Sequence, residues 1–276
     1  MSNNDKIKVS VVVVTFNEEK NIDRCLSSLS DFDEIIVVDS NSADKTKEIS
    51  AKHGARVIDF IWNGVYPKKR QWMLDNVETS NDWVFFVDAD EIVKKELVGE
   101  MKSIISNQID SKVAGYFIKG LYEFQGKILK YGQVNNKLSL INRKYIEFPV
   151  IDDLDILGMG EIEGHYQPVI KDEYAGHGLS ILQLNEYLVH HALEDEEKWV
   201  ERHKRYAIWE TGMNQKKAWP EDPVYIRRIM KNIFKKLPFR GLFIFIYSYF
   251  FKLGFLDGCA GFNFAVKRMY YYSLIG

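Results

Sequence analysis

The chain has 276 residues, of which 46% are hydrophobic and 28% are charged, and its formal net charge is −2. A chain of this length and composition buries one large core with an appended segment. Its two cysteines, Cys25 and Cys259, exclude a disulfide framework and fit a reducing cytoplasm. The polar residues 1–5 run straight into the first apolar segment, so we expect no secretory leader.

Strands and helices are expected to alternate over the first 92 residues. The runs that predict strands are residues 8–14, 34–38, 56–59 and 83–87, and helical patterns begin near residues 22 and 46. This alternation predicts a parallel sheet with right-handed crossovers, whose ligand site lies outside the carboxyl ends of the strands. The polar residues at or just beyond those ends are Asn17, Asp39, Asp44, Asp88 and Asp90. Several acids at the same sheet edge predict a site, whereas one acid would not.

The fourth strand ends in three carboxylates within four positions, Asp88, Asp90 and Glu91. Carboxylates cost several kcal/mol to desolvate unless a positive charge lies opposite them. A Mg²⁺ or Mn²⁺ ion that carries substrate phosphates meets this need, because such ions take oxygen ligands and keep positions open for phosphate. The alternative is a strand that runs out into solvent, with the acids capping the following helix.

Two nucleotide- or phosphate-handling folds compete with this interpretation. A dinucleotide-binding Rossmann domain requires Gly-x-Gly-x-x-Gly after the first strand, but Thr15, Asn17 and Glu18 occupy that turn. A haloacid-dehalogenase-like phosphatase places Asp-x-Asp after the first strand of its domain, whereas three strands precede Asp88 here. The sequence therefore argues against both.

Residues 11–18, 35–46 and 87–91 resemble the nucleotide-binding half of a family 2 glycosyltransferase. The resemblance implies an α/β chain with the GT-A fold, a mostly parallel central sheet flanked by helices, and inverting transfer from a nucleotide sugar. Residues 163–167, 199–206 and 254–258 are similar, more loosely, to a bacterial branch that builds exopolysaccharide or lipopolysaccharide. The resemblance thus extends over nearly the whole chain.

The resemblance also implies roles for individual residues. The base and ribose of the nucleotide would lie among Thr15, Asn17, Glu18 and Asp39, and Asp44 would order the turn or reach the nucleotide. Asp88 would approach the ribose or the metal, and Asp90 would ligate the metal directly. The ion would stabilise charge on the leaving diphosphate. By family habit, the expected donor is a UDP-sugar.

Three adjacent cations, Lys68, Lys69 and Arg70, stand just before a predicted helix. Cations and a helix N-terminus together neutralise a diphosphate. The segment resembles a donor-contacting element of the bacterial branch, and this resemblance implies that Lys69 and Arg70 are the phosphate ligands. The sequence does not tell which of the three cations points inward. The alternative is a solvated basic turn.

An inverting transferase needs a base that takes the proton from the acceptor hydroxyl. Glu163 is the first candidate, followed by Glu161 and His165, and an extended backbone would place all three on one face. The family often carries an Asp after another acid at this point, but no Glu-Asp pair stands in residues 158–165. The acids Asp152, Asp153 and Asp155 are typical of an exposed loop.

Residues 185–210 are expected to form a helix, with a break near residues 194–195. Trp199, His203, Tyr206 and Glu210 recur at helical spacing and share a face, which is most simply explained by core packing. Alternatively, Arg202, His203 and Arg205 meet the diphosphate of the donor or of a lipid-linked acceptor. His190 and His191 precede the break in this helix and are candidates for the acceptor or metal environment, but a pair of histidines is weak evidence for a metal site.

The last 54 residues carry nine Lys or Arg and a single acid, Asp257, and they hold 15 of the 38 aromatic residues. The apolar run 241–251 is too short to span a bilayer, which needs about 20 residues. Basic residues beside an aromatic face are typical of a helix in an anionic membrane interface. The alternatives are packing on the catalytic domain or a homo-oligomer contact, and no motif supports nucleic-acid binding.

We therefore expect a GT-A domain over residues 1–222, with a donor half at about 8–92 and an acceptor half at about 115–206. A basic, aromatic helical tail would follow from residue 223 to 276. The expected function is metal-dependent sugar transfer to a glycan or polyprenyl-diphosphate-linked acceptor, at the cytoplasmic face of a bacterial plasma membrane. The alternatives are a Mg²⁺-dependent phosphatase that uses Asp88, and a noncatalytic sugar-nucleotide-binding subunit of the same fold.

Overall fold

A computed structural model describes residues 6–107, 112–164, 166–191, 196–220 and 225–275. The chain forms two compact units. The first comprises Met1–Leu121, Asn135–Phe148 and Gln167–His190, and the second comprises Tyr122–Val134, Pro149–Tyr166 and His191–Gly276. The expected junction at 222/223 lies outside the described residues, so the predicted division into domain and tail stays a prediction.

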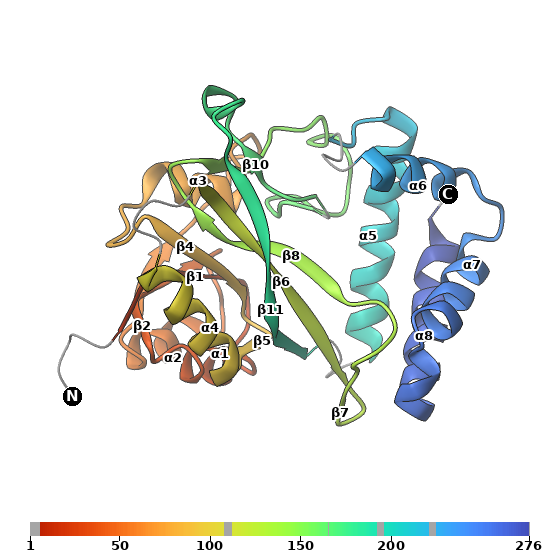
Figure 1. The fold of residues 1–276 in the computed structure, drawn as a ribbon, viewed down its shortest axis with the longest axis horizontal. Coiled ribbons are helices and arrows are strands. Elements are labelled where there is room, and N and C mark those ends of the chain that lie inside the picture. Colours follow the sequence, from red (N-terminus) through yellow and green to blue (C-terminus); the bar gives the residue numbers. More distant parts are fainter. Residues whose placement is uncertain (1–5, 108–111, 165, 192–195, 221–224, 276) are drawn as a thin grey trace. The chain divides into compact units, whose positions relative to one another are not determined.

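A central sheet in the order β3-β2-β1-β4-β8-β6-β11-β5 dominates the first unit (Figure 1). Its strands are β1 (Ile7–Thr15), β2 (Phe32–Asp39), β3 (Arg56–Asp59), β4 (Trp83–Asp88), β5 (Glu91–Val93), β6 (Val113–Phe124), β8 (Asn135–Asn142) and β11 (Ser180–His191). The first four strands pair in parallel, and β8 joins β4 antiparallel. Two short strands, β9 (Ile146–Glu147) and β10 (Val169–Ile170), form a separate ribbon.

Helices cover both faces of the parallel part of this sheet. Helices α1 (Ile22–Ser27), α2 (Thr46–Lys52) and α4 (Lys95–Ser106) lie on one face, and α3 (Lys69–Asn76) lies on the other (Figure 1). Val11 of β1 packs with the first group and Val12 with α3, because successive strand residues point to opposite faces. The strand is therefore apolar throughout, as expected for a strand buried on both sides.

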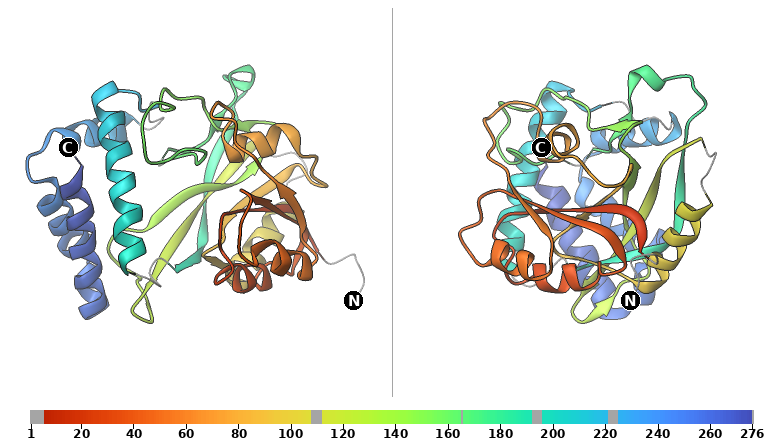
Figure 2. Two further views of the ribbon diagram at one scale, coloured as in Figure 1. Left: turned by 180° about the vertical axis from the view of Figure 1, so that it is seen from behind. Right: turned by 90° about the vertical axis from the view of Figure 1, so that its left-hand side faces the viewer.

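The second unit is mainly helical. Its elements are the short strand β7 (Lys127–Ile128), α5 (Glu196–Lys216), α6 (Tyr225–Lys236), α7 (Arg240–Ile246), a π-helical turn (Tyr247–Phe251), a 3₁₀ turn (Gly254–Asp257) and α8 (Gly258–Leu274). Helix α8 runs beside α7 (Figure 2). Trp199 and Ala207 of α5 pack with Tyr271 and Ile275 at the end of the chain, which joins α5 to α8.

The helix that we expected over residues 185–210 is wrong in its first part. Residues up to His191 belong to β11, where Leu188 pairs with Val93 of β5, and the helix α5 begins only at Glu196. Leu184 and Leu188 are both buried, but residues four apart share a face in a helix as well as in a strand, so this pattern does not distinguish the two. Residues 188–190 pair with β5, which is far away in the sequence, and this pairing favours a strand although the local pattern favours a helix. The predicted break near residues 194–195 lies outside the described residues.

No single helix among the described residues is long and apolar enough to cross a membrane. The segments Arg240–Phe251 and Gly254–Leu274 reach that length and composition only together, and they are bent by 73°.

The packing of α8 at this bend can be tested by a substitution at Gly261, with Gly99 of α4 as the control. A Cβ atom at Gly261 of α8 would lie 2.1 Å from the backbone oxygen of Gly254, whereas a Cβ at Gly99 of α4 would meet nothing within 4 Å. Gly261→Ala should therefore destabilise the chain by about 1–3 kcal/mol through overpacking. Gly99→Ala should stabilise it by up to about 1 kcal/mol, because alanine favours helices. Thermal unfolding of both variants measures this, and equal shifts would contradict the close approach of Gly261.

Candidate donor and metal site

The loops after β1 and β2 are tied together by the polar residues that the sequence singled out. Thr15 and Asp39 face each other in register, and the Thr15 hydroxyl donates to Asp39 Oδ2 at 2.8 Å. Asp39 also accepts from the backbone N–H of Ser42 at 2.7 Å and from its hydroxyl. Asp39 is fully buried, so these donors satisfy a carboxylate that would otherwise be costly.

Asn17, Glu18 and Asp44 cross-link the same two loops. Asn17 adopts a left-handed conformation, with φ of 55°, and its Oδ1 accepts from the N–H of Ala43. The N–H of Glu18 donates to the Thr46 hydroxyl. Asp44 accepts from the N–H and hydroxyl of Thr46, and these bonds lower its pKa although burial opposes the shift. Of the two expected roles of Asp44, ordering the turn is thus directly visible.

The acids after β4 face two cations that reach them from distant parts of the chain. Arg70, in the first turn of α3, donates to Asp88 Oδ1 at 2.7 Å. Lys137 of β8 lies between Asp88 Oδ2 and Glu91 Oε1, and its Nζ donates to both, at 2.6 Å to Glu91. Glu91 also accepts from the N–H of Asp88. Both oxygens of Asp88 are thus engaged by protein cations.

These contacts hold all four groups in their charged forms. Burial alone would raise the pKa of Asp88, but Lys137 and Arg70 outweigh it and lower that pKa well below its ordinary value. Burial would likewise raise the pKa of Glu91, and Lys137 again reverses the direction. For Lys137 burial works the other way, and the two carboxylates raise its pKa far above the usual range. Two cations therefore balance two acids without a metal ion.

Asp90 has a different neighbour, His190 of β11. His190 Nδ1 lies 3.4 Å from Asp90 Oδ1 and 3.4 Å from Glu91 Oε1, because His190 pairs with Glu91 across the β11–β5 ladder. Burial would lower the pKa of His190, but Asp90 and Glu91 raise it. An acid and an imidazole this close can also share a divalent cation.

The donor atoms of Asp90 and His190 fit a particular class of metal site. The described part of the chain holds no group of three or more His, Cys, Asp or Glu side chains arranged around one ion. Mg²⁺ and Mn²⁺ do not need such a cage, since Mg²⁺ binds through one or two protein ligands and completes its shell with water and substrate phosphates. The residues present therefore fit an ion delivered with a diphosphate, and metal binding by Asp90 and Asp88 stays a prediction.

Lys68, just before α3, and Lys69 and Arg70, in its first turn, are turned toward the protein, so the alternative of a solvated basic turn is wrong. Lys68 and Lys69 are buried, with 1% and 5% of their surface exposed. Lys69 Nζ donates to the backbone oxygen of Thr15 at 3.3 Å, which brings it to the end of β1. Lys69 and Arg70 thus place positive charge at the carboxyl ends of β1 and β4.

The candidate bases belong to the second unit. Glu163 is buried and Glu161 is half-buried, whereas His165 lies outside the described residues. A hydrogen bond from the N–H of Ile162 to the oxygen of Met159 closes a turn, so the segment is not the extended strand that would align Glu161 with Glu163. Their predicted catalytic roles stay predictions.

The acidic loop before these residues is only partly exposed. Asp152 and Asp155 are exposed and both pair with Lys216, as expected of surface acids. Asp153 is buried and accepts from Trp209 Nε1 at 3.0 Å, so the prediction that it is exposed is wrong. The indole N–H of α5, which the local sequence does not reveal, satisfies this carboxylate inside the unit.

The aromatic face of α5 packs within the second unit. The rings of Trp199 and His203 stack with centroids 3.8 Å apart, and His203 Nδ1 lies 2.8 Å from the backbone oxygen of Trp199. Tyr271 of α8 donates a hydrogen bond to Glu210. These contacts support core packing, the simpler of the two explanations for this face.

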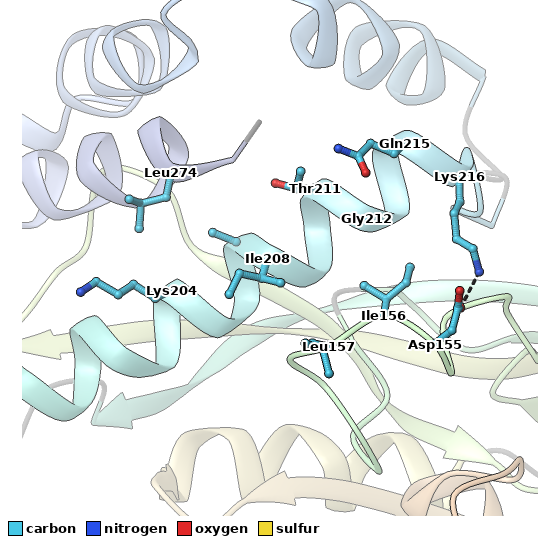
Figure 3. A pocket seen from close by; sticks show the side chains of 11 residues that line it. Asp155, Ile156, Leu157, Lys204, Ile208, Thr211, Gly212, Gln215, Lys216 and Leu274 are labelled. Carbon is cyan, nitrogen blue, oxygen red and sulfur yellow. Dashed lines mark hydrogen bonds and ion pairs between the residues drawn. The ribbon is translucent and has the colours of Figure 1, made fainter.

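A groove of about 700 Å³ lies along α5 in the same unit (Figure 3). Its apolar wall includes Ile156, Leu157 and Ile208, and Leu274 borders it. Lys216 is paired with Asp155 at one end, and Lys204 lies at the other. None of the residues that we expected to bind the donor lines this groove.

The comparisons with known proteins agree with this geometry. The model of the family "Glycosyl transferase family 2" matches residues 10–147, half of the chain, and the chain belongs to this family. It is 34% identical over 144 residues to an uncharacterized glycosyltransferase of Rickettsia typhi, a match that covers 51% of this chain and 48% of that one. It is 27% identical over 156 residues to the prophage-derived glycosyltransferase SunS of Bacillus subtilis, covering 48% and 35%. The chain thus spans about half or less of the length of these relatives.

Among solved structures, the chain resembles the mannosyltransferase PcManGT from Pyrobaculum calidifontis. The TM-score is 0.52 with 13% identity, over 99% of this chain and 87% of that chain. The predictions of an α/β GT-A fold with a helical C-terminal end and of a family 2 glycosyltransferase are therefore confirmed. The resemblance to the polysaccharide-building branch stays a prediction.

The buried lysine gives a direct test of the charge balance in this site. Lys137→Met leaves Asp88 and Glu91 with one counter-charge fewer, which should cost up to about 3 kcal/mol of stability. Lys119→Met, on the neighbouring strand β6, removes an exposed lysine and should change stability by less than about 0.5 kcal/mol. Urea unfolding of both variants measures the difference. Equal stabilities would mean that the acids do not depend on Lys137.

Proposed function

We propose that this chain is an inverting, metal-dependent glycosyltransferase that moves a sugar from a nucleotide-diphosphate donor to an acceptor hydroxyl. The observation that carries the proposal is the Asp90–His190 pair at the end of the parallel strands, beside the cations Arg70 and Lys69. A metal-binding pair and inward-pointing cations at this sheet edge suit a sugar diphosphate.

Asp90 and His190 would hold Mg²⁺ or Mn²⁺, which supplies Lewis-acid stabilisation of the leaving diphosphate when it is bound. Lys69 and Arg70 would lie along the phosphates and add fixed positive charge. Asp88 lies between Arg70 and Lys137, and in this proposal a remaining lone pair of its carboxylate would accept a hydrogen bond from the ribose. Alternatively, Asp88 would be the second metal ligand, as we predicted from the sequence.

The nucleoside would lie over the cross-linked loops after β1 and β2. Thr15 and Asp39 are buried and bonded to each other, so they shape the floor of this region. Phe16 is 59% exposed at the end of β1 and offers a ring on which a base can stack. PcManGT was solved with GDP-Man and Mn²⁺, and this supports a nucleotide sugar and a divalent ion here. A UDP-sugar remains our first choice from family habit.

Glu163 is the proposed general base, with Glu161 and His165 as alternatives. Glu163 is buried, and a Cβ atom on the adjacent Gly164 would lie 2.5 Å from the Trp209 ring, so the chain around Glu163 is tightly packed. A carboxylate that packing holds in one position suits a general base, which must lie within hydrogen-bond reach of the acceptor hydroxyl.

The acceptor in this proposal is a glycan or a polyprenyl-diphosphate-linked sugar in cell-surface polysaccharide synthesis. The groove along α5 supports an amphipathic acceptor, because it has apolar walls and lysines at its ends. The basic, aromatic segment from residue 225 onward supports a location at the inner face of the plasma membrane, with a homo-oligomer as the alternative. The phosphatase alternative has less support, because cations occupy both oxygens of its nucleophile, Asp88.

Replacing the proposed metal ligand tests the function itself. Asp90→Asn should abolish the Mn²⁺-dependent stabilisation by UDP and lower transfer at least about 100-fold, because the leaving group loses its charge partner. The control is Asp75→Asn, an exposed acid on α3 that lies outside the proposed site. Thermal shift with UDP and Mn²⁺ reads out binding, and UDP release from a panel of nucleotide sugars reads out transfer. Unchanged binding in Asp90→Asn would refute the metal assignment.

The base assignment needs a separate measurement. Glu163→Gln should keep the affinity for donor and Mn²⁺ but lower transfer to acceptor at least about 100-fold, since the amide cannot take the acceptor proton. Single-turnover transfer at saturating donor separates the two effects. Near-normal turnover would move the base to Glu161 or His165, which the corresponding Gln and Ala variants then distinguish.

A further inference from the structure

Exposed apolar side chains are concentrated at the end of this chain. Five of them follow one another closely at the bend between α7 and α8, where they are between 43% and 76% exposed. These residues, which we call the apolar tip, are Phe250, Phe251, Leu253, Phe255 and Leu256. Exposed apolar side chains grouped in this way along the chain are typical of an interaction site.

The apolar tip is held in place by a buried acid. Asp257 accepts hydrogen bonds from the N–H groups of Lys130 and Tyr131, at 3.3 and 2.9 Å. Its backbone oxygen accepts from Lys127 Nζ, and the oxygen of Lys252 accepts from the N–H of Gly132. The turn is thus fixed to residues 127–132 of the same unit, so its apolar side chains are presented on a rigid frame.

The surroundings of the tip are cationic. Asp257 is the only acid in residues 225–275, and it is buried, so this part of the chain exposes no carboxylate among its described residues. Lys130 and Lys252 are exposed beside the tip. Tyr131 and Tyr247 are also exposed, at 41% and 44%. Apolar residues with a rim of lysine and tyrosine are the side chains that occupy a bilayer interface.

The shape of the segment favours insertion into one leaflet over crossing. The helical segments on either side of the tip are bent by 73°, and neither is long and apolar enough to span a bilayer alone. The charge favours lipid over a second copy of the chain. A two-fold contact through the tip would bring like charges such as Lys130 and Lys252 together, whereas anionic headgroups would neutralise them.

We propose that the apolar tip inserts into the boundary between headgroups and acyl chains of an anionic lipid bilayer, with Lys130 and Lys252 at the level of the phosphates. The inference deepens the proposed function, because it specifies how a transferase acting at the membrane surface is held there. The two remain separable, since vesicle binding needs no nucleotide and donor binding needs no vesicle.

Flotation of the full chain with lipid vesicles tests the proposal. We expect binding to phosphatidylcholine vesicles that contain phosphatidylglycerol, weaker binding at high salt, and little binding to phosphatidylcholine alone. The double variant Phe251→Ser and Leu256→Ser should lower the partition coefficient at least about tenfold. The control, Val150→Ser and Leu154→Ser, removes exposed apolar residues from the loop before Gly158 and should bind as the unaltered chain does.

Three results would overturn the proposal: equal binding by the tip variant and the unaltered chain, equal loss in the control, or equal binding to neutral vesicles. Light scattering without vesicles adds a fourth, because a dimer that the tip variant converts to a monomer would make the tip a protein interface. Thermal shift with UDP and Mn²⁺ shows that the tip variant is folded and keeps its donor site. Loss of that shift in the unaltered chain would refute the proposed function while leaving the flotation result intact.

Discussion

The bridge from Lys137 to Asp88 and Glu91 is the interaction on which the site depends. Two carboxylates three residues apart, with Glu91 fully buried, would repel each other and favour protonation. The Lys137 ammonium lies between them, and Arg70 engages the remaining oxygen of Asp88. The acids therefore stay ionised. Hydrogen bonds between its backbone and side chains also hold the turn between β4 and β5 in one geometry.

This charge balance changes the role of a metal ion in the site. From the sequence, an ion was expected because the acids needed a positive partner. The structure gives Asp88 and Glu91 protein cations instead, and ammonium and guanidinium groups cannot themselves ligate a metal. Asp90 faces His190, whose imidazole can bind a divalent cation once it gives up its proton. An ion bound there would be held by few protein ligands, so its affinity would depend on the diphosphate.

Much of the first unit was predictable from local sequence, because its strands are apolar runs and its turns carry polar residues. β1 to β4 and the positions of Thr15, Asp39 and Asp88 at strand ends follow from that pattern. Lys137 and His190 were not assigned to the site, because antiparallel pairing brings them in from β8 and β11, 46 and 99 residues after Glu91. The same long-range pairing made a strand of residues 185–191, where helical spacing had seemed the better description. Local patterns identify an element's ends but not its distant partners.

The role of a buried acid in this chain depends on the group that lies against its carboxylate. Hydroxyl and amide donors satisfy Asp39, an indole satisfies Asp153, and backbone N–H groups satisfy Asp257. Each of these acids stabilises a turn or a helix contact, and none has a partner that a ligand would readily replace. Asp90 lies against an imidazole, a group that binds metals. Among these buried or half-buried acids, Asp90 is therefore the one whose surroundings favour exchange with an incoming substrate complex, and this is the physical basis for placing the donor phosphates beside it.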